Sequence, residues 1–422
     1  MTDIINELAG LDGTSDTGAE LIALRERRAD AVANAQLSFE ALLEPDNPGT
    51  FTLAERYAIA AYVAGVTQAP AASTFYLDLL ADEAPAALVD ALRTAIAETL
   101  SETLETSGAQ GPQWQSDFVV YAPDSALGRR LAAALDFAHL LTIHPKDASP
   151  KAIGHLDAAG WSTDDIVSLG QLISFLAFQL RVAHGLQVLA GDTPADAQPV
   201  QPQGDGAVLS TLVADPGWEV TANTLTPQVT PPAKFVNHPL GWKPWVPAME
   251  KADFTDVHVD ALIKPERIDM PYFRLLARDP AALKARTLTD LDIFYNTAGG
   301  MGRAERELAA TVASRYNGCE YCASVHQGRA KEEGGDATII DRLLDEGIGA
   351  DLETPEWTAI RDAAVALTTT HIAFTGEHVA QLREVGFDDL SIIDAINSSA
   401  FFNWANRLML TLGEPDVPKR YQ

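Results

Sequence analysis

The chain has 422 residues, 47% of them hydrophobic, which is enough for roughly two or three domains with buried cores. It carries 59 Asp and Glu against 30 Lys and Arg, so its formal net charge of -29 would repel a nucleic-acid backbone. No stretch resembles a signal peptide or reaches the roughly eighteen uninterrupted apolar residues typical of a membrane helix. We therefore expect a folded, soluble, cytoplasmic protein whose partners include neither nucleic acid nor membrane.

The sequence predicts an all-α protein. Ala, Leu and Glu dominate, and alternating β-branched runs bounded by turn residues are scarce. Helical patterning runs from about Ala35 to Leu189, and short loops interrupt it at 44–49 and near 108–112. We assign residues 1–190 to a first helical domain.

The composition changes in residues 191–254, where prolines recur too closely for a helix. Trp218, Trp242 and Trp245 lie among these prolines, together with an apolar run at Phe235 and Val236. A flexible linker is one interpretation. The tryptophans favour the other, in which the later half lies on the protein surface as an ordered, extended strap.

Helical periodicity resumes near Asp256 and continues to about Gly413, which defines a second helical domain at 255–422. This domain is related to the first by weak internal similarity. Residues 55–64 align with 305–313, and residues 160–167 align with 386–393. The second register also pairs Phe175 with Phe401, Phe178 with Trp404 and Arg181 with Arg407. We predict a tandem duplication.

Both cysteines of the chain, Cys319 and Cys322, form a C-x-x-C motif that is followed after three residues by His326. Asn317 and Gly318 are predicted to end a helix that begins near Arg303, which places the cysteines in the first turn of the next helix. Positions 319, 322 and 326 share one face of that helix. Two thiols and an imidazole are thereby expected to converge.

The position of this motif favours thiol chemistry. A helix N-terminus lowers the pKa of a thiol, and His326 is one turn from Cys322. Upstream, Glu307 shares a helical stripe with Thr311 and Ser314, so its carboxylate can orient a histidine or accept a proton. Glu320, between the cysteines, acts in the opposite direction because its charge disfavours a thiolate.

Three other interpretations of the motif are weaker. A structural zinc site needs four ligands, and beyond the motif the C-terminal half offers only scattered histidines such as His371 and His378. Inert buried thiols beside an unrelated histidine are possible. A thioredoxin-like site would follow a β-strand, whereas the preceding segment is helical.

The spacing E-x(11)-C-x-x-C-x(3)-H resembles the signature of the AhpD-like alkylhydroperoxidases, within the carboxymuconolactone decarboxylase superfamily; here it is formed by Glu307, Cys319, Cys322 and His326. Residues 402–407, with Gly413 after them, resemble the FN-x-x-NR…G stretch of peroxidase-related members. The resemblance covers about 270–413 and extends, through the internal repeat, more weakly to 35–189.

The resemblance implies an all-helical, homo-oligomeric thiol peroxidase without cofactor or metal. In that mechanism Cys322 is the peroxidatic thiol, Cys319 is the resolving thiol, and Glu307 and His326 form the proton relay. The substrate would be an organic hydroperoxide, and an external dithiol, such as a lipoylated or thioredoxin-like protein, would restore the thiols. Some of these enzymes have a histidine before the second cysteine, where this chain has Tyr321.

The first copy lacks these groups. Alignment of Glu55 with Glu305 places Tyr57, Ala69, Ala72 and Tyr76 at the positions of the glutamate, the two cysteines and the histidine. We expect this copy to be inactive in thiol chemistry and to act as a pseudo-subunit.

Three classes of function remain. The leading one is a peroxidase or dithiol oxidoreductase. The second is a non-redox enzyme of the same superfamily that acts on a small carboxylated metabolite, and the third is a redox-sensing protein whose C-x-x-C oxidation changes its assembly without turnover.

Overall fold

The computed structural model describes residues 3–106, 117–192 and 208–422, and within these ranges its regular secondary structure consists of helices and two small two-stranded sheets. The predicted all-α class is confirmed. The predicted loop at 108–112 and the first part of the proline-rich segment, 193–207, lie outside the described residues.

The first half of the described chain begins with two short helices, at Ile4–Leu8 and Asp16–Arg25, which lie before the predicted start of the helical pattern at about Ala35. Short helices give little periodic signal, so they were not predicted. The elements of this half, with η for 3-10 helices, are α1 (Ile4–Leu8), α2 (Asp16–Arg25), η1 (Glu26–Arg28), α3 (Ala29–Leu43), α4 (Leu53–Val66), α5 (Pro70–Glu83), α6 (Ala86–Thr106), β1 (Phe118–Tyr121), α7 (Gly128–Ile143), η3 (Pro145–Asp147), α8 (Pro150–Ala158) and α9 (Thr163–Leu189).

The rest of the described chain comprises the extended segment at 208–254 and the second half. Its elements are β2 (Leu209–Val213), β3 (Gly241–Pro244), η4 (Lys251–Asp253), α10 (Asp256–Ala261), η5 (Pro265–Asp269), α11 (Pro271–Leu276), α12 (Pro280–Tyr295), α13 (Arg303–Asn317), α14 (Glu320–Glu332), α15 (Ala337–Glu346), α16 (Pro355–Thr368), α17 (Gly376–Glu384), α18 (Asp389–Thr411), β4 (Gly413–Asp416) and η6 (Lys419–Tyr421). Strand β1 pairs with β2, and β3 pairs with β4, both antiparallel.

The two halves repeat the same helix order, with α4 and α5 corresponding to α13 and α14, and α7 to α9 corresponding to α16 to α18. Their arginine anchors also match. The Nε of Arg56 donates to the carbonyl of Phe51, five residues back, and the Nε of Arg306 donates to the carbonyl of Met301. These repeated local contacts support the predicted duplication.

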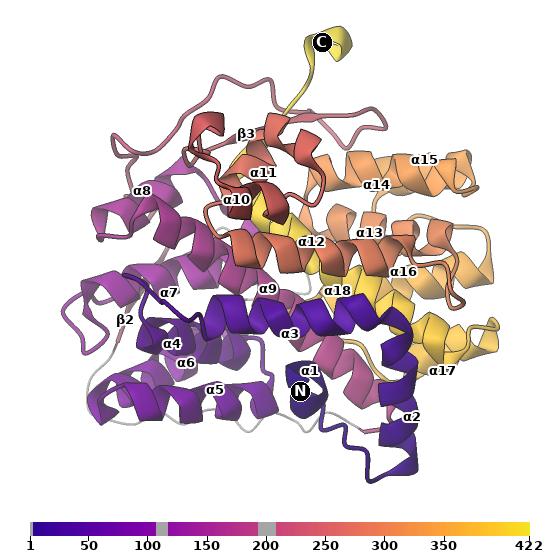
Figure 1. Cartoon of the computed structure of the whole chain (residues 1–422), viewed down its shortest axis with the longest axis horizontal. Coiled ribbons are helices and arrows are strands. Elements are labelled where there is room, and N and C mark those ends of the chain that lie inside the picture. Colours follow the sequence, from indigo (N-terminus) through magenta and orange to yellow (C-terminus); the bar gives the residue numbers. More distant parts are fainter. Residues whose placement is uncertain (1–2, 107–116, 193–207) are drawn as a thin grey trace.

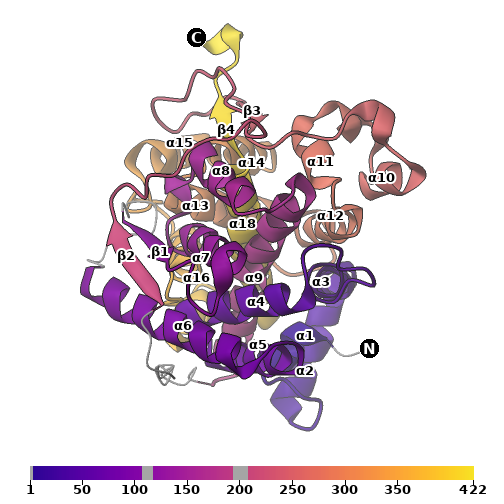
Figure 2. The ribbon, with the colours of Figure 1, turned by 90° about the vertical axis from the view of Figure 1, so that its left-hand side faces the viewer.

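The long helices α9 and α18 pack against each other at the centre of the molecule, between the remaining helices of each half (Figures 1 and 2). A Cβ added to Gly185 would come within 2.7 Å of the Ile396 side chain, so glycine is what allows this close approach. Helix α9 is long and apolar enough to span a membrane by length and composition alone, but 94% of its most apolar window is buried inside the protein. It is therefore a core helix of this fold.

The described part of the proline-rich segment lies against the helices as extended chain. The indole of Trp242 donates to the carbonyl of Met409 at 2.9 Å, and β3, which contains Trp242, pairs with β4 directly after α18. Trp218 stacks on His155 with ring centroids 4.6 Å apart. The division of the chain at residues 190 and 254 stays a prediction.

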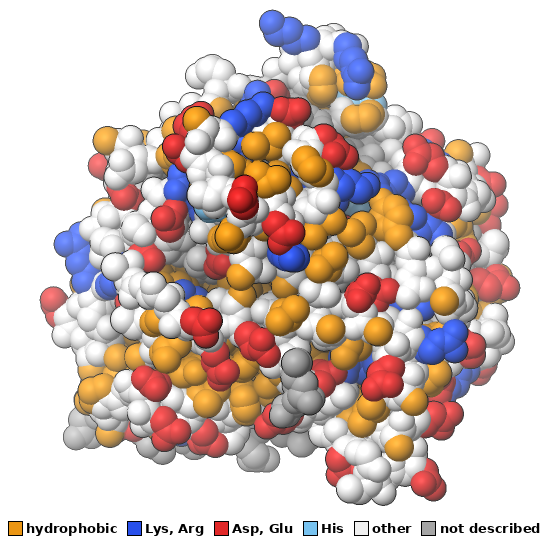
Figure 3. Space-filling model, viewed as in Figure 1, with side chains coloured by type: hydrophobic (Ala, Val, Ile, Leu, Met, Phe, Trp, Pro, Cys, Tyr) orange, Lys and Arg blue, Asp and Glu red, His pale blue; other side chains and the backbone are white. Residues whose placement is uncertain are grey.

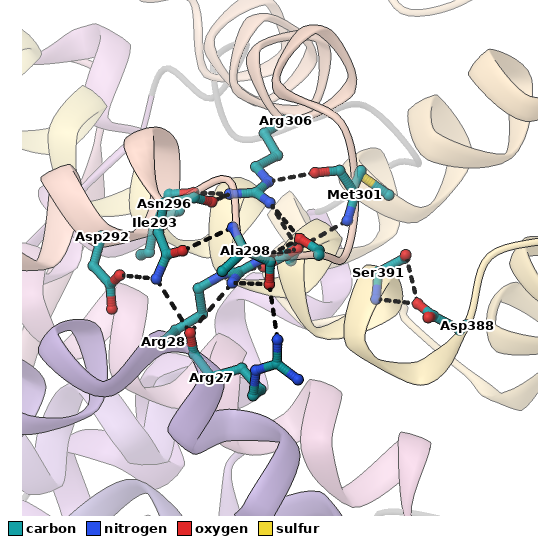
Figure 4. Close-up of polar contacts among 12 residues, drawn as sticks. Arg27, Arg28, Asp292, Ile293, Asn296, Ala298, Met301, Arg306, Asp388 and Ser391 are labelled. Carbon is teal, nitrogen blue, oxygen red and sulfur yellow. Dashed lines mark hydrogen bonds and ion pairs between the residues drawn. The ribbon is translucent and has the colours of Figure 1, made fainter.

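A buried ion cluster joins the N-terminal helices to the loop that precedes α13. Arg28 of η1 donates to both carboxylate oxygens of Asp394, at 2.9 and 2.7 Å, and Arg306 approaches the same carboxylate at 3.1 Å. Arg28 also donates to the carbonyl of Gly299 in that loop (Figure 4). The first half of the chain thereby fixes the start of the helix that carries Glu307.

Candidate active site

The local fold around the cysteines is the predicted helix–glycine–helix unit. Helix α13 ends at Asn317, Gly318 adopts a left-handed conformation with φ of 77°, and Cys319 is the N-cap of α14. Glycine is favoured there because other residues are strained at positive φ. The predicted helix boundaries are confirmed.

Glu307 and His326 contact each other directly. The Oε2 of Glu307 lies 2.5 Å from the Nδ1 of His326, and its Oε1 accepts two hydrogen bonds from Arg303, at 2.9 and 2.8 Å. Burial acts to raise the pKa of Glu307, but the charge of His326 and the hydrogen bonds from His326 and Arg303 outweigh burial and lower it. Glu307 is therefore an ionised, fully buried carboxylate.

The ionised carboxylate selects a tautomer of His326. Because Glu307 can only accept a hydrogen bond, the proton of a neutral His326 must lie on Nδ1, and Nε2 is left as a proton acceptor. The imidazole lies 4.1 Å from the Phe402 ring, centroid to centroid, in an edge-on arrangement that restricts its rotation. The structure thus brings Glu307 and His326 together, and their role as a proton acceptor stays a prediction.

The two cysteines occupy different environments. Cys322 lines a cavity of about 140 Å³ together with Glu307 and His326, whereas Cys319 is not in the cavity wall and is 1% exposed. Burial, followed by the neighbouring Cys322 thiol, raises the pKa of Cys319 well above its ordinary value. Cys319 therefore stays protonated at neutral pH, and Cys322 is the thiol within reach of a ligand.

Tyr321 lies between the two cysteines, directly before Cys322. It lines the same cavity, and burial raises its pKa to about 12. At neutral pH the phenol is protonated, so it can donate a hydrogen bond but cannot serve as a base.

The first half of the chain contributes a cation beside the cysteines. The Nζ of Lys146, from η3, lies 2.7 and 2.6 Å from the two carboxylate oxygens of Glu320. The methylene stem of Lys146 passes so close to Gly318 that an added Cβ would lie 3.0 Å from it. The expectation that Glu320 opposes a thiolate is confirmed, because its charge is among the causes that raise the pKa of Cys319, and Lys146 pairs with the same carboxylate.

The FN-x-x-NR stretch lies beneath the cavity and ties helix ends together. Asn403 accepts a hydrogen bond from Asn317 at 3.2 Å and one from Arg407 at 2.9 Å. Asn406 accepts one from Asn317 at 3.0 Å. Asn317 precedes the glycine turn, so these amides hold the turn that positions Cys319.

Several residues of the cavity wall were not predicted from the sequence; they include Tyr272, Arg286, Asp290, Phe294, Arg329, Phe401 and Met409. Most of them come from α12 and α18, far from the motif along the chain. Arg286 and Asp290 are one helical turn apart, a spacing that is common in surface helices, so it did not indicate that the two residues line a cavity. Within the described ranges, no group of three or more His, Cys, Asp or Glu side chains is arranged to hold a metal ion.

The corresponding positions of the first copy are closed. Ala69 is the N-cap of α5, as Cys319 is of α14, and Ala72 is buried. Tyr57 and Tyr76, at the positions of the acid and the imidazole, are 6% and 0% exposed. Burial raises the pKa of both phenols. The absence of thiol chemistry in this half stays a prediction.

Comparison with known proteins finds that the cysteine-bearing region is similar to a family. Residues 280–367 match the sequence model of the Carboxymuconolactone decarboxylase family. A solved structure of an uncharacterized peroxidase-related protein from Silicibacter sp. TM1040 is 24% identical, and the match covers 42% of this chain and 96% of that chain with a TM-score of 0.34. A search of curated proteins finds no match. Residues 280–367, which include both cysteines, Glu307 and His326, are thus similar in sequence to the carboxymuconolactone decarboxylase family.

Proposed function

We propose that the protein is a thiol-dependent peroxidase that reduces organic hydroperoxides through Cys322 and Cys319. The observation that carries the proposal is the contact between Glu307 and the Nδ1 of His326. It leaves Nε2 as a base in the cavity that also holds the Cys322 thiol. The family match of this segment supports the assignment.

The first step forms a sulfenic acid. His326 accepts the proton of Cys322, and the thiolate attacks the distal oxygen of the hydroperoxide. The O–O bond breaks, the sulfur keeps the distal oxygen as a sulfenic acid, and the alkoxide takes up the proton held by His326 to leave as an alcohol. Sulfur is oxidised by two electrons, and the peroxide is reduced by two.

The second step forms a disulfide. The thiol of Cys319 attacks the Cys322 sulfur, an S–S bond forms, and the sulfenic oxygen leaves with two protons as water. The raised pKa of Cys319 suits this role, because a thiol that remains protonated does not compete for the peroxide. An external dithiol then reduces the disulfide and is itself oxidised to a disulfide.

The setting of this cycle is also a proposal. We place the protein in the cytoplasm, where reductants keep thiols available, and expect copies of the chain to associate into a homo-oligomer. A lipoylated or thioredoxin-like protein would supply the dithiol.

Mass spectrometry tests the proposal directly. The protein is treated with one equivalent of cumene hydroperoxide, then with dihydrolipoamide, and the peptide that holds both cysteines is read at each stage. We expect a disulfide within seconds and its reversal by the dithiol. Cys319→Ser should trap a sulfenic acid on Cys322, and Cys322→Ser should consume no peroxide.

Two outcomes would replace the proposal. Reduced thiols together with an activity that survives alkylation would favour a non-redox enzyme of the family. A disulfide that forms and changes the oligomeric mass without repeated peroxide consumption would favour a redox sensor.

A further inference from the structure

Arg286 of α12 is a buried cation in the wall of the Cys322 cavity. It is 6% exposed, and its guanidinium carbon lies 5.1 Å from the ring centroid of Phe401 and 5.8 Å from that of Tyr272. Its Nε has no hydrogen-bond partner, and no carboxylate in the described part of the chain forms an ion pair with it. Aromatic rings hold the guanidinium in place and leave its N–H donors unused.

The neighbouring arginines are already engaged. Arg303 donates to Glu307, and Arg329, which also lines the cavity, donates to the hydroxyl of Tyr295. These two cations have partners within the protein, so Arg286 is distinguished from them by its unused donors.

Asp290 interacts with Arg286 by charge but, among the described residues, forms no ion pair with it. It lies one turn after Arg286 on α12 and lines the same cavity. Burial raises the pKa of Asp290, although the charges of Arg286 and His326 oppose the shift. Arg286 is thus a cation in the cavity wall with no ion-paired carboxylate among the described residues, within a chain whose net charge is -29.

A buried cation without a partner is costly, since the loss of hydration is not compensated. A carboxylate would compensate it, because the planar guanidinium can donate two parallel hydrogen bonds to the two carboxylate oxygens. The remaining wall suits a compact hydrocarbon body, as it includes Phe294, Phe402 and Met409. Figure 3 shows basic side chains beside hydrophobic ones over the region where α11, α12 and α14 meet.

We infer that Arg286 is a specificity-determining residue that binds a carboxylate of the substrate, so that the preferred substrates are organic hydroperoxides carrying a carboxylate. The inference rests on the proposed function for the peroxide group. The carboxylate of the substrate would bind at Arg286 while its hydroperoxide group reaches Cys322. Arg286 and Cys322 both line the same cavity.

A matched pair of substrates tests the inference. Cumene hydroperoxide and its 4-carboxy derivative differ only in the carboxylate. We expect the wild type to have at least a tenfold higher kcat/KM for the carboxylated member. Arg286→Gln should abolish this preference, and Arg286→Lys should retain part of it because the charge remains without the planar fork. Lys284→Gln, two residues earlier on α12, is the control that should keep the wild-type preference.

A binding measurement separates this inference from the proposed function. Calorimetry with 4-isopropylbenzoate, which has no peroxide group, should give an affinity that falls at least tenfold in Arg286→Gln. Binding of this carboxylate without any peroxide reduction would overturn the peroxidase proposal and leave the carboxylate site standing. Equal kcat/KM for the two hydroperoxides in the wild type, or an equal fall for both in Arg286→Gln, would overturn the role of Arg286 in specificity.

Discussion

Arg181 and Arg407 make reciprocal contacts between the two halves of the chain. The Nη2 of Arg181 donates to the carbonyl of Thr368 at the end of α16, and the Nη2 of Arg407 donates to the carbonyl of Thr142 near the end of α7. Each arginine also donates from Nη1 to the carbonyl four residues earlier in its own helix, at 3.0 Å. The distance along the chain between the two arginines equals that between the two threonines, so each half donates a hydrogen bond to a carbonyl at a helix end of the other half.

Replacement of either arginine should destabilise the protein to a similar extent. Arg181→Met and Arg407→Met each remove a charged hydrogen-bond donor from a buried carbonyl group of the other half, and we expect a loss of about 2 kcal/mol in the free energy of unfolding. Urea unfolding measures it. Only Arg407→Met removes a donor to Asn403, so it alone should also slow disulfide formation at the cysteines. Equal oxidation rates in the two variants would contradict this link.

The proton relay predicts a large kinetic effect of Glu307→Gln. An amide in place of the carboxylate removes the charge that stabilises a protonated His326, so oxidation of Cys322 should slow by about 100-fold. Stopped-flow measurement with cumene hydroperoxide gives the rate. Glu305→Gln, on the same helix but outside the cavity wall, is the matched control and should oxidise at the wild-type rate. If Glu305→Gln were as slow as Glu307→Gln, the cause would be a general defect of α13 and not the loss of the relay.

The lowered pKa of Glu307 also predicts how stability depends on pH. Since the folded pKa lies below the ordinary value of 4.5, the unfolded chain binds this proton first as the pH falls. The contribution of Glu307 is therefore present above about pH 4.5 and is lost as the pH falls through the folded pKa. The wild type should lose more unfolding free energy than Glu307→Gln when urea unfolding at pH 6 is compared with unfolding below pH 4. Parallel losses in the two proteins would contradict the assignment.

The ion pair of Lys146 and Glu320 predicts opposite effects of two single substitutions. Lys146→Gln leaves the charge of Glu320 uncompensated beside the cysteines and should slow Cys322 oxidation about threefold, in keeping with a partly exposed pair. Glu320→Gln should speed it, and the double variant should lie close to the wild type. The coupling of the two changes in a double-mutant cycle measures the interaction. If the effects of the two substitutions on the oxidation rate simply add, Lys146 does not influence the reactivity of the cysteines through Glu320.

The motif at the cysteines could be predicted because its contacts are short in sequence. Glu307 and His326 are 19 residues apart, and a glycine turn between two helices determines how they meet. Helical periodicity and the preference of glycine for positive φ are properties of the local chain. They were sufficient to predict the all-α class and the turn at Gly318, whereas the resemblance to a known family implied the pairing of the acid with the imidazole.

The rest of the site depends on contacts between distant segments. Lys146 meets Glu320 across 174 residues, and Arg286 reaches the cavity only because α12 packs beside α13 and α18. An isolated lysine or arginine in a helical sequence has no feature that distinguishes it from a solvated surface charge. The sequence by itself determined which thiols, acid and base are present and how they are spaced. Only the tertiary structure decided which thiol is accessible and which cations surround it, because burial and charge pairing are set by how the two halves of the chain fold against each other.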